Sequence, residues 1–201
     1  MKRTMFLAGA VVLSAVCFAG DCFSQGGVQN DTLKTIFSRK SVRSYTGGPV
    51  TDEQLTMLVK AGMPAPTAVD ALPWDFIVIT DKTVLKRLSD ALPYAKMAVS
   101  AGAAIMVTGD LKRQFGGQDS LYWIMDCSAA SENILLAAES MGLGAVWTAV
   151  YPDQARVAAV RSILGIPENA MPLNFIPVGI PTGQDKPKDK FDAKRIHKDR
   201  W

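Results

Sequence analysis

Residues 119–152 constrain the fold more than any other stretch, because they predict one long helix followed by a strand. Asp119 or Ser120 can cap the start of the helix, and Gly142 stands where a left-handed residue ends one. Apolar side chains spread around most of its circumference, which predicts burial on several sides. They are Ile124, Met125, Ala129, Ile134, Leu135, Leu136, Ala138 and Met141. In a chain of 201 residues, this indicates a sheet against one side and a second subunit against the other.

Small side chains on the same helix would let a helix of that second subunit approach closely. They are Ser128, Ala129, Ser131 and Ala137. The strand that follows, residues 144–151, would then start at the subunit interface. We therefore expect the functional site to lie nearby.

The rest of the chain predicts an α+β domain in which helices flank a mixed central sheet. Helices are expected from Asp31, after a capping box at 51–54, after residue 80, and from Asp153 to Gly165. The other strands are expected at 74–80, 103–108 and 173–180. We expect the strand–helix–strand unit at 144–180 to pair in parallel, with a right-handed crossover.

Residues 1–24 predict a secretory signal, which makes residues 25–201 the mature domain and the periplasm its expected location. Lys2 and Arg3 precede an apolar run from 5 to 19, and small residues follow it. A spanning helix needs about 20 apolar residues, so an uncleaved anchor is the weaker alternative. No small residue precedes Cys17 or Cys22, which disfavours lipid attachment.

The remaining cysteine and the charges narrow the chemistry. Cleavage leaves only Cys127, which we interpret as a small buried hydrophobe because the only histidine, His197, is far away in sequence. The formal net charge is +3, and the tail at 183–201, with seven Lys or Arg against four Asp, accounts for it. A near-neutral body excludes the broad basic face of a nucleic-acid-binding protein.

Three groups of residues are candidates for chemistry. In extended chain, Arg39, Ser41 and Arg43 share one side, with Lys40 between them. Two guanidinium groups and a hydroxyl suit a phosphate, because each guanidinium can bond two oxygens. The alternative is a solvated basic surface.

The second group is the loop at 65–74, where Thr67 and Asp70 are the only polar side chains between two prolines. The third is the tail pair Lys188 and Lys190. An ordinary helix-to-strand connection and a solvated charged tail are the alternatives.

Taken in order, these groups resemble the nitroreductase family of FMN-dependent oxidoreductases. Residues 39–43 are similar to its opening Arg-Arg-Ser-x-Arg signature, and residues 65–74 to its Ala-Pro-Ser-Ala-x-Asn-x-Gln-Pro-Trp loop. Residues 126–144 resemble its central helix and the exit from it. Residues 164–167 and 177–181 resemble the closing strand, and residues 187–190 the late basic pair.

The resemblance implies a homodimer with one FMN in each of two clefts between the subunits. Arg39, Lys188 and Lys190 would hold the phosphate, Ser41 would help through its backbone or hydroxyl, and Lys40 would belong to the same cofactor site. Arg43 would lie at the pyrimidine end of the ring, where a cation stabilises the reduced flavin. Thr67 and Asp70 would reach the ring from the other subunit. Backbone amides at Thr148, Ala149 and Val150 would face N5, and no catalytic side chain or metal is required.

The chain departs from the family pattern at three positions. Asp70 replaces the usual Asn, Leu72 the usual Gln, and Lys190 a common Arg. An ionised carboxylate near the flavin would oppose its reduction and repel anionic substrates. These changes leave FMN as the expected cofactor and the substrate class open.

The implied activity is ping-pong hydride transfer through flavin N5 to nitroaromatics, quinones or other electron-poor acceptors. The alternatives are an exported flavin-binding protein without turnover and a flavin-consuming or dehalogenating enzyme on the same fold. NADH or NADPH is the donor that the resemblance implies, whereas export would separate the protein from those nucleotides. We therefore expect a different donor and slow reaction with NAD(P)H.

Overall fold

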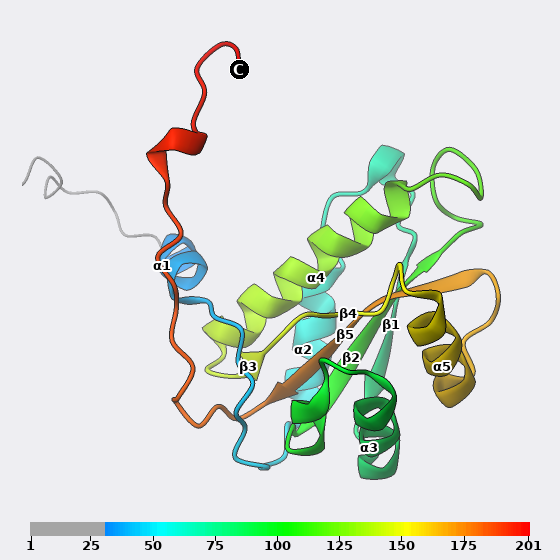
Figure 1. Cartoon of the computed structure of the whole chain (residues 1–201), viewed down its shortest axis with the longest axis vertical. Coiled ribbons are helices and arrows are strands. Elements are labelled where there is room, and N and C mark those ends of the chain that lie inside the picture. Colours follow the sequence, from blue (N-terminus) through cyan, green and yellow to red (C-terminus); the bar gives the residue numbers. More distant parts are fainter. Residues whose placement is uncertain (1–30) are drawn as a thin grey trace, which may run out of the picture. The chain divides into compact units, whose positions relative to one another are not determined.

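One antiparallel sheet forms the centre of the computed structural model, which describes residues 31–201 (Figure 1). The predicted signal segment at 1–24 lies outside the described residues. The strand order is β1-β2-β5-β3, and β4 also pairs with β5. The strands are β1 (Trp74–Ile79), β2 (Ala103–Asp110), β3 (Gly144–Ala145), β4 (Thr148–Ala149) and β5 (Ala170–Gly179).

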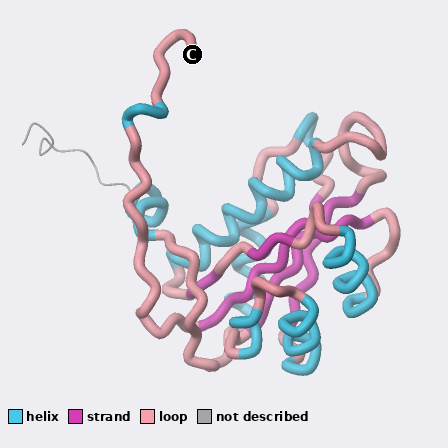
Figure 2. Tube along the Cα trace, in the orientation of Figure 1, coloured by secondary structure: helices cyan, strands magenta, loops and turns pink. Residues whose placement is uncertain are grey.

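Helices cover both faces of this sheet (Figure 2). They are α2 (Asp52–Gly62), α3 (Lys82–Ala91), α4 (Tyr122–Ser140) and α5 (Gln154–Leu164), whereas α1 (Asp31–Ser38) lies beside α4 and away from the sheet. Side chains of β2 alternate between the two faces, so Ile105 packs in the cluster with α2 and α4, and Met106 in the cluster with α3 and α5. Residues 103–109 are therefore all buried, and the predicted α+β class is confirmed.

The predicted long helix is α4, and the burial predicted for its apolar side chains is only partly observed. Trp123, Cys127, Ile134 and Ala138 are buried against the sheet and α2. Met125, on the opposite side of the first turn, is instead 59% exposed. Leu121, with no side-chain cap, occupies the N-cap position instead of Asp119 or Ser120. The predicted left-handed residue at the other end is confirmed, since Gly142 has φ +71°.

The parallel pairing expected across 144–180 is wrong. Gly144 pairs with Gly179 and Thr148 with Phe175, both in antiparallel register. Gly165, at φ +67°, turns the chain at the end of α5, and β5 then begins beside the residues that follow β4. It therefore runs back past β4 and β3. Every strand pairing within residues 31–201 is antiparallel, so the sheet is not mixed as predicted.

The tail after β5 leaves the sheet and passes alongside α1 (Figure 1). It contains one short helical turn, η3 (Ala193–Arg195), and is exposed along most of its length. Over residues 31–201, no helix is long and apolar enough to cross a membrane.

Candidate functional site

The segment after α1 is fixed to the sheet by backbone hydrogen bonds. The N–H of Val42 donates to the carbonyl of Ala145 at 3.0 Å. Farther along, Tyr45 forms a bridge with Pro181, and the N–H of Thr46 donates to Ile180 at 3.0 Å. The segment therefore lies between β3 and the beginning of the tail.

Side chains of this segment alternate, as expected for extended chain. Val42 points into the protein and is 1% exposed. Arg39, Ser41 and Arg43 line a groove of about 1100 Å³ whose opposite wall is the tail at 184–191. The basic segment and the tail pair, far apart in sequence, thus meet in one groove, as the resemblance implied.

The groove carries an excess of positive charge, with six cationic side chains against two carboxylates. Lys188 and Lys190 form no hydrogen bond or ion pair with any other described residue, so both are available to an anion. Asp185 is bound to the protein instead, because its Oδ2 accepts the N–H groups of Arg43 at 3.0 Å and Ser44 at 3.2 Å. That carboxylate fixes the wall of the groove.

Two of the predicted cations already have carboxylate partners on α4. Lys40 Nζ lies 2.9 Å from both oxygens of Glu139, and the pair is half-buried. Its ammonium is held toward the end of α4. Arg39 forms an ion pair with Glu132, with Nε 3.0 Å from a carboxylate oxygen, and also lines the groove.

The loop with Thr67 and Asp70 lies elsewhere, at the other end of α4. The only hydrogen bond from residues 67–72 to another element of the described chain joins the N–H of Ala68 to Asp126 Oδ1, at 3.0 Å. Thr67 Oγ1 accepts the N–H of Leu72 at 3.2 Å. Asp70 is exposed at the tip of the loop.

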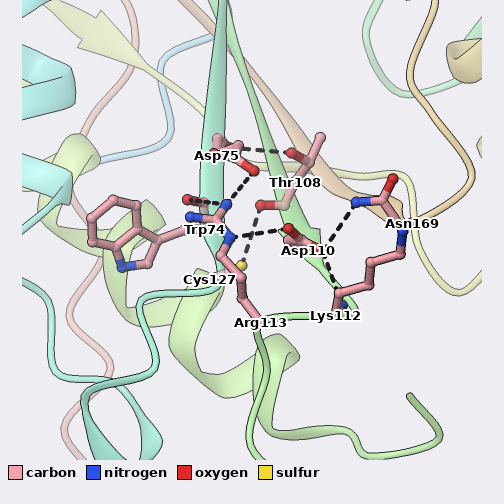
Figure 3. Close-up of polar contacts among 8 residues, drawn as sticks. All are labelled: Trp74, Asp75, Thr108, Asp110, Lys112, Arg113, Cys127 and Asn169. Carbon is pink, nitrogen blue, oxygen red and sulfur yellow. Dashed lines mark hydrogen bonds and ion pairs between the residues drawn. The ribbon is translucent and has the colours of Figure 1, made fainter. Parts of the chain in front are cut away.

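The loop leads into β1, where a charged network holds the chain (Figure 3). Arg113 pairs with Asp75 and with Asp110, whose other oxygen accepts from Asn169 at 3.1 Å. The backbone N–H of Asp110 also donates to Pro73. These contacts raise the pKa of Arg113 against the opposing effect of its burial, and hydrogen bonds from Asn169, Lys112 and Arg113 outweigh burial to lower the pKa of Asp110.

Most polar groups of the predicted strand residues 148–150 form hydrogen bonds with β5. Thr148 Oγ1 donates to the carbonyl of Phe175 at 2.6 Å, and the N–H of Val150 donates to Leu173 at 3.0 Å. Ala149 alone is exposed. The amide of Val150 is therefore already bonded, and Ala149 is the member best placed to meet a ligand.

A single chain thus assembles only part of the predicted site. The groove contains Arg39, Lys40, Ser41, Arg43, Lys188 and Lys190. Neither the loop with Thr67 and Asp70 nor residues 148–150 line it. Their roles stay predictions, and a second chain would have to supply the loop.

Sequence reasoning missed the carboxylates that organise this site: Asp126, Glu132, Glu139 and Asp185. Asp126 carried the one visible signal, since it stands among apolar residues on a helix predicted to be buried. The other three are ordinary surface residues by sequence.

Cys127, the one cysteine within residues 31–201, is buried. Burial, with a smaller effect of Asp126, raises the pKa of the Cys127 thiol to about 12, so it stays protonated at neutral pH. No group of three or more His, Cys, Asp or Glu residues in this part of the chain could hold a metal ion.

A sequence profile of the Nitroreductase family matches residues 36–94 and 91–180 of this chain. An Archaeoglobus fulgidus protein provisionally named NADH dehydrogenase/NAD(P)H nitroreductase is 41% identical over 174 residues, covering 85% of this chain and 99% of that protein. A solved structure from Bacteroides thetaiotaomicron with the same provisional name is 49% identical, with a TM-score of 0.81, and the match covers 86% of this chain and 99% of that one. A provisional nitroreductase from Desulfovibrio desulfuricans, solved in complex with FMN, is 25% identical over 86% of this chain and 99% of its own, with a TM-score of 0.74.

Proposed function

The chain belongs to the nitroreductase family, and from this premise we propose that it is an FMN-dependent oxidoreductase that reduces nitroaromatics, quinones or other electron-poor acceptors. The observation that supports FMN most directly is the groove in which Arg39, Ser41 and Arg43 face Lys188 and Lys190. It is large enough for a ligand of this size and carries the positive charge that a phosphate needs. The residues present therefore fit FMN.

In this proposal, the groove residues bind and orient the cofactor. The guanidinium of Arg39, together with Lys188 and Lys190, binds the phosphate. Arg43 provides the cation at the pyrimidine end of the ring, where it favours the reduced state. When bound, FMN supplies reversible two-electron hydride chemistry, so a donor and an acceptor can use the same open cleft in turn.

We extend the proposal to a homodimer, because two helices leave apolar side chains uncovered. No residue of α1 is buried, and Phe37 on that helix is 73% exposed. Met125 at the start of α4 is 59% exposed. Exposed apolar clusters of this kind mark association surfaces. A second chain would also bring a loop with Thr67 and Asp70 to each groove.

For the donor we propose that NAD(P)H reacts slowly, since the predicted export would separate the mature protein from those nucleotides. The name of the Archaeoglobus fulgidus relative includes NADH and NAD(P)H, which favours the opposite outcome. The rate at which NADH and NADPH reduce the flavin therefore decides between the two outcomes.

The absorbance spectrum of the purified protein tests cofactor binding, and anaerobic photoreduction followed by reoxidation tests turnover. We expect a bound-flavin spectrum and reoxidation by a nitroaromatic or a quinone that is much faster than with free FMN. Reoxidation no faster than free FMN would indicate a flavin-binding protein without turnover. Loss of the flavin chromophore or release of halide from a halogenated aromatic would indicate a flavin-consuming or dehalogenating enzyme.

A further inference from the structure

The loop at 67–72 holds an unfavourable backbone conformation. Val69, Asp70 and Leu72 have φ values of +48°, +58° and +46°. Residues other than glycine disfavour this left-handed region, and a β-branched residue such as Val69 does so most strongly. Such a conformation persists only where surrounding contacts impose it.

Contacts inside the loop are short-range. The N–H groups of Asp70 and Ala71 donate to the carbonyls of Thr67 and Ala68, and the N–H of Leu72 donates to Thr67 Oγ1. They close a turn but do not attach it to the protein.

One side chain makes that attachment. Across the described residues, the bond from the Ala68 N–H to Asp126 Oδ1 is the only hydrogen bond from residues 67–72 to another element. Asp126 is 4% exposed and lies on the buried face of α4, between Trp123 and Ala130. Its other oxygen, Oδ2, is buried with no hydrogen-bond partner among the described groups.

A carboxyl group in this position opposes stability, because burying a polar oxygen without a partner is costly. An apolar residue would suit the core better. Asp126 instead supplies a hydrogen-bond acceptor for the start of the strained loop. The other end of the loop is fixed to β2 by the hydrogen bond between Pro73 and Asp110.

We propose that Asp126 is a positioning residue for the flavin ring, which it controls by holding the loop that presents Thr67 and Asp70. The flavin part rests on the proposed function and on the second subunit proposed with it. The loop part stands on the contacts of this chain alone, so the two are tested by different readouts.

The first readout is amide hydrogen exchange at Asp70, Ala71 and Leu72 in FMN-free protein. Asp126→Ala removes the acceptor and should speed exchange about tenfold, as expected for one lost hydrogen bond. Asp126→Asn keeps an acceptor and should stay within about twofold of wild type. Ser131→Ala is the matched control: it removes another buried polar group from α4, one that contacts Cys127 and Asn174 but not the loop.

A donor-side variant keeps the test decisive if Asp126→Ala does not fold. Ala68→Pro removes the N–H itself, at the first residue of a turn that follows extended Thr67, where proline is sterically accepted. It should also speed exchange. In the Asp126→Ala background, Ala68→Pro should add less than about twofold, because the bond is already absent.

The second readout is flavin affinity. Asp126→Ala should weaken FMN and riboflavin by the same factor, about fivefold to tenfold, since the loop reaches the ring and not the phosphate. Unchanged loop exchange in Asp126→Ala, or independent effects of the two substitutions, would overturn the proposal whatever the flavin result. Faster exchange with unchanged flavin affinities would overturn the flavin role. Failure of the wild-type protein to bind any flavin would refute the proposed function, while the exchange result would still decide whether Asp126 holds the loop.

Discussion

Val42 packs so closely on Gly144 that an added Cβ on the glycine would lie 2.5 Å from Cγ1 and 2.8 Å from Cβ of the valine. We predict that Gly144→Ala destabilises the protein by about 1–3 kcal/mol, because the segment at 39–43 must shift. It should also weaken FMN binding, since that segment forms one wall of the groove. Denaturant unfolding and flavin titration measure the two effects.

Gly62→Ala is the matched control for that substitution. Its added Cβ would lie 3.1 Å from the Ile134 side chain and 3.3 Å from the backbone oxygen of Ala130, both on α4, so it also requires a small local shift, but it is remote from the groove lining. Flavin affinity should not change. Equal losses of affinity in both variants would mean that Gly144→Ala acts through general destabilisation.

Arg39→Ala should weaken FMN binding by about 1.5–3 kcal/mol, the range for a charge-assisted hydrogen bond. Riboflavin lacks the phosphate and should be nearly unaffected. Titration of both ligands into the flavin-free protein provides the comparison. Glu132→Gln controls for the ion pair on Arg39, and we expect it to preserve or tighten FMN binding because it frees Nε. Equal losses for FMN and riboflavin would remove Arg39 from the phosphate site.

Met125→Lys should disrupt the homodimer without harming the fold of one chain. Met125 is 59% exposed, so a lysine there costs a monomer little, whereas a buried interface would not accept its charge. Sedimentation velocity should show a shift toward monomer and loss of bound FMN. Met57→Lys is the control, because Met57 is also a helical methionine and is 52% exposed. A Met125→Lys protein that is still a flavin-loaded dimer would exclude this part of α4 from the interface.

The buried thiol of Cys127 should make the protein less stable in alkali. Burial raises its pKa from 9.0 to about 12, so between these values the folded state keeps a proton that the unfolded state releases. Stability is therefore full below pH 9 and falls as pH rises through this window, by at most about 1.4 kcal/mol per pH unit. Cys127→Ala should flatten the decline of the unfolding free energy between pH 9 and 11. Parallel curves for the variant and wild type would contradict this. The buried Tyr45 hydroxyl, whose pKa is also raised, adds a decline common to both.

Local signals predicted the features that depend only on neighbouring residues. Thr51 and Gln54 form the predicted capping box, Asp153 caps α5, and Gly142 and Gly165 take left-handed conformations. The alternation at 39–43 likewise placed Arg39, Ser41 and Arg43 in the groove and Val42 in the core, because extended backbone has a fixed period.

Features that depend on contacts between distant residues were not predictable in this way. The direction of β5 depends on where the chain returns after α5, which no local pattern encodes. The left-handed backbone at Val69 contradicts its residue type and follows from tertiary contacts. Lys40 and Glu139 are 99 residues apart, so their pairing is visible only in the fold.

The electron donor depends on where the protein functions, and two predictions oppose each other here. Residues 1–24 predict export, whereas the family and the name of the Archaeoglobus fulgidus relative favour NAD(P)H. We predict that protein from the native envelope fraction begins near residue 25 and that NADH and NADPH reduce its flavin slowly.

NADPH should be the slower donor of the two, because the carboxylate of Asp70 would repel its additional phosphate. Asp70→Asn should narrow that difference. N-terminal sequencing and anaerobic stopped-flow reduction decide the matter. An intact Met1 on protein from the soluble fraction, with fast reduction by either nucleotide, would show that the N-terminal segment is not a working signal and that the donor is the one typical of the family.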